Sequence, residues 1–297
     1  MKTETFHLEL ITPCFCAGAN QAVAEIRPAS IRGQLRWWFR AFGGNAKDEA
    51  LIFGSAAGDS GCGSRVRITV SDLKPATQGS LPVFSPNDPQ SYVWHYARVS
   101  GTTERGASGP RWRPQGALPV GTTFKMHVTW LRELPNLKPV FNEALAAFLT
   151  FGTLGLRATR GLGAFHCNHP TDIQKVISSL EGRMFTIRMR TDPSEFGDYS
   201  SALKDWASWL RYKLRKDHKA ERPSPLGGSG GSDTRQASAV HFRPYRIGNN
   251  KIAWLAFEAP ASRVLGTASS KNFPLPLLSN YCFSGPAPRP EPKSNRY

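Results

Sequence analysis

The chain has 297 residues, with 38 Lys and Arg against 22 Asp and Glu, which gives a formal net charge of +16. This excess favours polyanionic partners, and 40% hydrophobic residues exclude a wholly disordered chain. The apolar runs are too short for a membrane span and the first residues contain no secretory segment, so we expect a soluble cytoplasmic protein with no membrane partner. The odd number of cysteines, 5, predicts reduced thiols.

Alternation of polar and apolar residues predicts a strand at residues 6–10, and residues 30–42 have the spacing of an amphipathic helix. We expect Ser30 to be its N-cap and Gly43 and Gly44 to end it. Beside the apolar stripe lies a second stripe of arginines at steps of four: Arg32, Arg36 and Arg40. Planar guanidinium groups suit bidentate phosphate contacts, although charged stripes are often only solvated faces.

Trp37 falls off the apolar stripe of this helix. An indole at such a position needs a partner, and we expect either another subunit or a base.

The rest of the chain predicts an α+β protein. Strands are expected at 65–70, 124–130, 185–190, 239–245 and 251–257, and helices at 140–151 and 199–215. The order of elements in the first half fits a βαββαβ, ferredoxin-like unit. The predicted organisation is a domain at 1–170 with an insertion at 74–123, a smaller domain at 171–283 with a flexible linker at 223–232, and a disordered Pro-rich tail at 284–297.

A glycine-rich segment at 152–163 follows the second predicted helix and contains four glycines and two arginines. It lacks the Lys-Ser/Thr pair of a nucleotide-binding loop. Glycines let backbone amides approach a phosphate and arginines bring the countercharge, so Arg157, Arg160, Gly161 and Gly163 are candidate RNA-binding residues. The alternative is a helix C-cap followed by a turn.

No metal, cofactor or catalytic residue is predicted. The His166 to His169 segment and the Cys14, Cys16 pair each hold too few ligands for zinc. There is no nucleophile elbow, and no histidine stands in a recognisable pairing with Ser or Cys.

Three segments together resemble the RAMP superfamily of CRISPR proteins: residues 26–41, residues 49–54, and the glycine-rich segment through Phe165. A further matching stretch lies at 235–244. Within the superfamily, the helix with paired tryptophans is most similar to a subunit of type III-B (Cmr) effector complexes. Arg27 and Ser30 belong to the first matching segment and complete the set of candidate RNA-binding residues.

The resemblance implies two ferredoxin-like domains, the second smaller or incomplete. It also implies a non-catalytic, RNA-binding role near the 3′ end of the guide RNA, where the chain would aid capture of target RNA. Guide RNA, target RNA and other Cmr RAMP subunits would then be its partners.

Superfamily subunits that cut RNA carry a catalytic Asp after the first strand. Residues 13–29 here contain no Asp and only Glu25 as an acid, which argues against cutting by this chain.

Two other classes stay open at this point. A metal-independent endoribonuclease that processes guide RNA precursors would need a general base, for which His7 and His95 are the N-terminal candidates. The second class is a protein that only bridges subunits and does not bind RNA, for which the high positive charge would have no explanation. Cleavage of a labelled repeat RNA without metal tests the first, and a salt titration of RNA binding tests the second.

Overall fold

The computed structural model describes residues 1–20, 23–56, 61–77, 88–94, 117–169, 172–192, 195–218, 226–229, 235–248, 251–264 and 276–289. His95 and most of the predicted insertion lie outside these residues, as does the tail from 290 onward. None of the helices in the described ranges is long and apolar enough to cross a membrane.

The first half of the chain forms a four-stranded antiparallel sheet in the order β2-β3-β1-β4. Its strands are β1 (Lys2–Leu10), β2 (Val66–Lys74), β3 (Thr123–Trp130) and β4 (Phe165–Cys167). The helices α1 (Pro28–Ala41) and α4 (Lys138–Phe151) follow β1 and β3, so the connectivity is βαββαβ. Connectivity and strand order together confirm the predicted ferredoxin-like unit.

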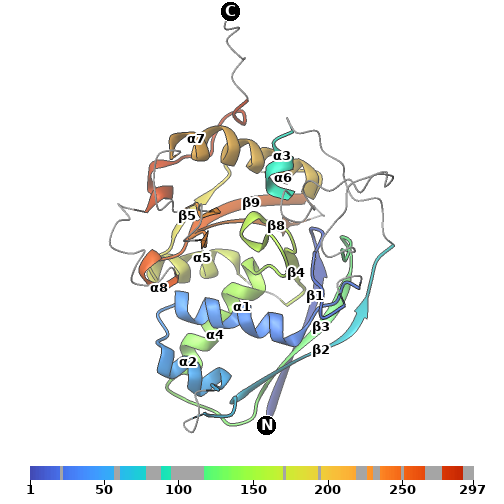
Figure 1. Cartoon of the computed structure of the whole chain (residues 1–297), viewed down its shortest axis with the longest axis vertical. Coiled ribbons are helices and arrows are strands. Elements are labelled where there is room, and N and C mark those ends of the chain that lie inside the picture. The colour runs from blue at the N-terminus through green and yellow to red at the C-terminus, as the bar shows by residue number, and fades with distance from the viewer. Residues whose placement is uncertain are drawn as a thin grey trace, which may run out of the picture.

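One face of this sheet is apolar and the other is polar, as expected for an antiparallel sheet with one solvated side. Phe6, Leu8 and Leu10 of β1 are buried with the helices, whereas Thr5 and His7 are exposed. Figure 1 shows α1 and α4 on the same side of the sheet.

The second half forms a three-stranded antiparallel sheet in the order β5-β9-β8. Its elements are β5 (Thr186–Met189), α6 (Tyr199–Trp209), β8 (Val240–Ile247) and β9 (Lys251–Glu258). This is the βαββ part of a ferredoxin-like unit. A complete unit would have a fourth strand beside β5. Among the described residues, this position has only a single parallel β-bridge, between Arg190 and Phe283. Within the described residues, the second sheet is therefore smaller than the first.

Both faces of the second sheet are buried, which explains the almost continuous apolar run of β9. Leu255 and Phe257 pack into the cluster that contains α1 and α4. Phe242 and Trp254 face the other way and pack against Trp206 of α6. The second sheet thus lies between α6 and α1 (Figure 1). Residues of both halves contribute to the hydrophobic cluster on each of its two faces.

Several shorter elements complete the described chain. They are α2 (Ala46–Phe53), α3 (Gln90–Trp94), α5 (Ile173–Gly182), α7 (Arg215–Asp217), α8 (Ala261–Val264), the 3₁₀ turns η2 (Ala158–Arg160) and η4 (Leu277–Asn280), and the paired strands β6 (Gly228–Ser229) and β7 (Arg235–Gln236). The helices α2 and α5 were not predicted, although Asn45 and Asp172 cap them with their side chains.

The structure differs from the sequence expectations at three points. Ser30 is not the N-cap of α1, because the helix begins at Pro28, whose fixed φ suits the first helical position, and Arg27 is the cap residue. The predicted helix 199–215 contains a π-helical turn, η3 (Leu210–Leu214). Within the predicted flexible linker, Leu226 is buried and residues 228–229 pair with β7.

Candidate nucleic-acid interface

The arginine stripe of α1 lies beside α2, and a buried carboxylate from α2 fixes two of its members. Glu49 is only 4% exposed. It pairs with the Nε of Arg36, while Nη1 of Arg40 donates to both Glu49 oxygens at 2.8 and 2.9 Å. The two arginine side chains still keep 40% and 41% of their surface exposed. Their guanidinium groups are therefore oriented but still reachable by a ligand.

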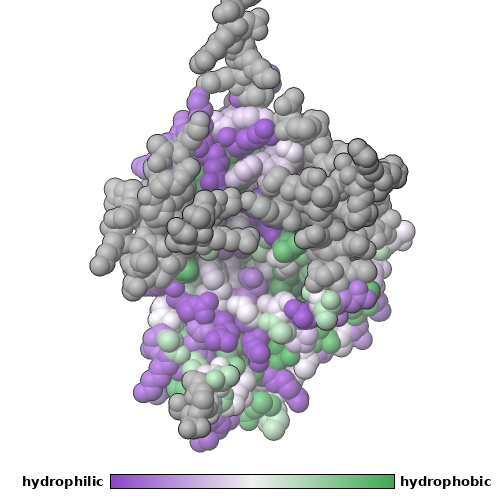
Figure 2. Space-filling view, in the orientation of Figure 1, coloured by the Kyte–Doolittle hydropathy of each residue, from purple (hydrophilic) through white to green (hydrophobic). Residues whose placement is uncertain are grey.

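The other predicted residues of α1 lie nearer to its start. Arg32 is exposed, Ser30 is half-buried, and Arg27 is exposed with Glu25 as a partner at 3.8 Å. Figure 2 shows hydrophilic residues gathered on this face of the molecule, over α1 and α2. The structure thus brings the candidates of the first segment onto one accessible helix.

The candidates of the glycine-rich segment lie elsewhere, inside the junction between the two halves. Arg160 is 3% exposed, and its Nη2 donates to the Leu226 carbonyl at 2.7 Å. Arg157 donates to the carbonyls of Val93 and Tyr92 at 2.7 and 2.9 Å. Both side chains are used within the fold, which differs from the expected exposure to a phosphate.

Gly161 and Gly163 are buried as well, and packing explains why they are glycines. Both have positive φ, 85° and 69°. A Cβ at Gly161 would lie 2.5 Å from the ring of Phe242, and one at Gly163 would lie 1.8 Å from the Leu154 carbonyl oxygen. These glycines allow close contact with protein, so in this structure they give no access to a phosphate.

Part of the chain's positive charge is used within the fold. Eight arginines in the described part of the chain donate to backbone carbonyls: Arg157, Arg160, Arg188, Arg190, Arg211, Arg215, Arg243 and Arg263. Arg263 bonds the carbonyls of Ala41 and Arg183, at the ends of α1 and α5. The net charge therefore overstates how many cations are available to bind a ligand. The arginine stripe of α1 is the strongest remaining candidate for an RNA-binding surface.

A buried basic cluster joins β8 to the end of α4. Arg243 is 1% exposed and donates to the carbonyls of Phe151 and Ala158. Burial lowers the pKa of Arg243 to about 9, and burial together with nearby Arg157 and Arg215 lowers that of Arg160 to about 9. The structural roles of Arg243 and Glu49 were not predicted, although both residues lie in segments that resemble the RAMP superfamily.

His241 belongs to the same cluster and supplies the partner for Trp37. The two ring centroids lie 4.7 Å apart, so Trp37 contacts the second half of its own chain. Arg243 can only donate, so the hydrogen bond at 3.0 Å makes Nδ1 of His241 an acceptor in a neutral ring. Burial first, then Arg243 and Arg160, hold the pKa of His241 well below its usual 6.5.

We predict that stability falls as the pH drops below about 6.5, because His241 binds a proton more readily in the unfolded chain. The stability that neutral His241 contributes is complete above the pKa of this histidine in the unfolded chain, and it is lost as the pH falls toward the lower pKa of the folded chain. Over this range the unfolding free energy changes by at most about 1.4 kcal/mol per pH unit. Burial first, and then Arg246, also lower the pKa of His166, which adds in the same direction. Urea unfolding across this range should show a shallower dependence of the unfolding free energy on pH for His241→Gln than for the wild type. Equal slopes for wild type and His241→Gln would contradict the assignment.

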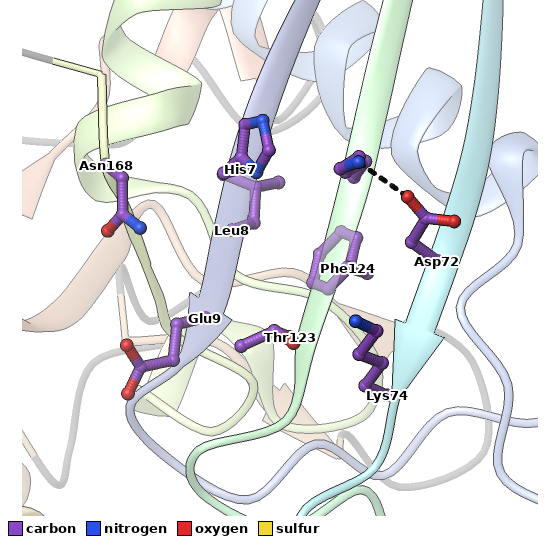
Figure 3. Close-up of a pocket in the computed structure, with 9 residues that line it drawn as sticks. His7, Leu8, Glu9, Asp72, Lys74, Thr123, Phe124 and Asn168 are labelled. Carbon is purple, nitrogen blue, oxygen red and sulfur yellow. Dashed lines mark ion pairs between the residues drawn. The ribbon is translucent and has the colours of Figure 1, made fainter.

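A cavity of about 220 Å³ opens on the polar side of the first sheet. Figure 3 shows it over the carboxyl ends of β1 and β2, where His7, Glu9, Asp72 and Lys74 surround it. Asp72 pairs with Lys125 at 2.7 Å, and acids and bases are present in similar number. This mixed lining has no preference for a polyanion.

In the described residues, no group of three or more His, Cys, Asp or Glu side chains could hold a metal ion. His169 lies against the ring of Phe6, with centroids 5.8 Å apart.

The strand order of the first sheet and the two helices on one of its faces define a ferredoxin-like fold. Comparison of the sequence with known families agrees with this fold. The chain belongs to the RAMP superfamily, whose sequence profile matches residues 7–166, just over half of its length. It is 24% identical over 212 residues to the CRISPR system Cmr subunit Cmr1-1 of Pyrococcus furiosus, with 69% of this chain and 56% of that protein covered. It is 42% identical over 78 residues to Cmr1-2 of the same organism, with 23% and 41% covered. The chain thus spans about half the length of the curated relatives it matches.

Two solved structures share the fold. The crystal structure of Cmr1 from Pyrococcus furiosus in its apo form has a TM-score of 0.52 at 20% identity, and the match covers 87% of this chain and 88% of that one. A chain of a cryo-EM structure of the type III-B Cmr-beta complex, bound to cognate target RNA and AMPPnP in the presence of ssDNA, has a TM-score of 0.51 at 12% identity. That match covers 86% of this chain and 93% of the other.

Proposed function

We propose that this chain is a non-catalytic RNA-binding subunit of a type III-B (Cmr) CRISPR effector complex. In this role it contacts guide and target RNA near the 3′ end of the guide and aids capture of target RNA, beside other RAMP subunits. Membership of the RAMP superfamily and similarity to Cmr1 support the proposal.

The observation that carries RNA binding is the arginine stripe of α1. Arg36 and Arg40 are held at fixed positions by buried Glu49, so their guanidinium groups lose little freedom when a phosphate binds. Arg32 continues the row toward the start of the helix. A regular row of cations follows a nucleic-acid backbone and reads no bases, which suits a subunit that must accept any guide sequence.

Salt dependence of RNA binding tests the proposal. If Arg27, Arg32, Arg36 and Arg40 each neutralise one phosphate of a single strand, log K falls with log salt at a slope of about −2.8, because each contact contributes about 0.7. Arg32→Ala is expected to reduce the magnitude of this slope by about 0.7. The measurement is a fluorescence titration with a mixed-sequence single-stranded RNA at several salt concentrations.

Arg67→Ala is the matched control, because Arg67 is an exposed arginine on β2 whose side chain lies on the sheet face opposite the helices. It should leave the slope unchanged. Equal losses from both variants would mean that binding is diffuse and that α1 is not the site.

The absence of catalysis by this chain is tested in a reconstituted complex. Glu25 is the acid of the 13–29 loop, and its carboxylate lies 3.8 Å from the guanidinium of Arg27. Glu25→Ala is expected to leave every cleavage band of the target RNA in place. Loss of one band with unchanged target binding would make this chain a nuclease.

A further inference from the structure

Two cysteines lie in contact in the first part of the loop between β1 and α1, at positions to which the proposed function assigns no RNA contact. The Sγ atoms of Cys14 and Cys16 are 3.4 Å apart, and the Cys14 thiol donates a hydrogen bond to the Cys16 sulfur. A disulfide needs a separation of about 2.05 Å, so a small movement of two side chains would join them. The contact is therefore close enough for chemistry between the two sulfurs.

The two thiols differ in a way that suits stepwise exchange. Cys14 is fully buried, whereas Cys16 is half-buried. The hydrogen bond from Cys14 lowers the pKa of Cys16 against the opposing effect of burial, and a backbone hydrogen bond from Glu25 lowers it further. The same contact and burial raise the pKa of Cys14 well above its usual value. Cys16 is thus the more exposed of the two thiols and the one whose pKa is lowered, so it is the one that a reagent from solvent meets first.

The surrounding backbone holds both cysteines in place. Cys14 exchanges two backbone hydrogen bonds with Leu118, each 2.9 Å long. The Cys16 carbonyl accepts from the amide of Glu25 at 3.0 Å. Gly155 leaves room for the buried sulfur, because a Cβ there would lie 3.3 Å from Cys14 Sγ and only 2.5 Å from the Phe15 carbonyl oxygen. The short distance between the sulfurs therefore follows from packing on both sides of the loop.

We propose that Cys14 and Cys16 form a reversible dithiol–disulfide site that reacts with a small disulfide such as glutathione disulfide. The Cys16 thiolate attacks one sulfur of glutathione disulfide, so a mixed disulfide forms and one glutathione thiolate leaves. Cys14 then attacks Cys16 Sγ, its proton passes to the departing sulfur, and the second glutathione leaves as a thiol. One glutathione disulfide is reduced to two glutathiones, and the two thiols become one disulfide.

The role of this bond is redox exchange and not stabilisation. A disulfide between positions i and i+2 closes a very short loop and removes little entropy from the unfolded chain. Disulfides with strained geometry are also reduced more easily than unstrained ones. The site does not depend on the proposed RNA contacts, so either proposal can fail alone.

The test uses the full-length native protein in glutathione redox buffers, followed by acid quenching, alkylation and mass spectrometry. Trypsin leaves both cysteines on one peptide, Thr3–Arg32, which contains no other cysteine. In oxidising buffer this peptide is expected to lose both alkylation sites and two hydrogen atoms, and a reducing buffer should restore them. Exposed Cys282 is the internal control and should carry glutathione under the same conditions.

Two variants separate the roles of the cysteines. In Cys14→Ser the mixed disulfide cannot be resolved, so glutathione should accumulate on Cys16. In Cys16→Ser the buried Cys14 should stay fully alkylatable after denaturation. The proposal is overturned if the wild-type peptide keeps both alkylation sites while Cys282 is modified. It is also overturned if the disulfide forms only in urea-unfolded protein, a measurement that needs no variant to fold.

Discussion

Replacing Asp205 by alanine is expected to lower the free energy of unfolding by about 3–5 kcal/mol, because it leaves a buried guanidinium without its countercharge. The side chain of Arg190 is 0% exposed and that of Asp205 10%. Nε of Arg190 donates to Asp205 at 2.9 Å, and Nε1 of Trp254 donates to the same oxygen at 3.0 Å. One carboxylate thus joins α6 to β9 and to the residue that follows β5.

Equilibrium urea unfolding measures this loss. Asp192→Ala is the matched control, because Asp192 is exposed just after β5, and its unfolding free energy should stay close to wild type. A double variant, Arg190→Met with Asp205→Leu, should recover much of the loss, since an apolar pair replaces the ion pair without an orphaned charge. A loss below about 1 kcal/mol for Asp205→Ala would mean that water reaches Arg190.

Replacing Trp38 by alanine is expected to cost about 3–5 kcal/mol of stability, since a large side chain leaves a cavity in the shared core. Trp38 is 0% exposed and stacks on Phe185 with ring centroids 6.1 Å apart. It also contacts Phe257 of β9, with centroids 5.3 Å apart. Denaturant unfolding should show one transition for both halves, because this core belongs to both.

Trp37→Ala is the matched control for this variant. Trp37 is the neighbouring residue of the same type but is only half-buried, so its removal should cost less. If the two variants cost the same, burial in the shared core is not what makes Trp38 important. Arg36→Ala should change stability less than Trp38→Ala, since Glu49 keeps its two hydrogen bonds from Arg40.

Sequence by itself determined the class of fold and the first ferredoxin-like unit. Alternation located β1 and β3, and helical spacing located α1, because in these elements one face is apolar and the other is not. The pairing of β8 with β9 followed from two adjacent predicted strands around a turn. The helix α2 carries weaker periodicity and was missed, so the partner of the α1 arginines was missed with it.

Only the tertiary structure decided which cations are available to a ligand. The sequence alone does not distinguish the exposure of Arg32 from that of Arg160, since each lies in a basic segment with glycines nearby. Arg32 is exposed on α1, but Arg160 is enclosed when the second half packs on the glycine-rich segment. Burial of an arginine depends on contacts between residues far apart in the chain, such as Gly161 against Phe242. The local sequence pattern does not predict these contacts. The type of each element is a local property of this sequence, whereas the accessibility of each arginine depends on how the two halves pack together.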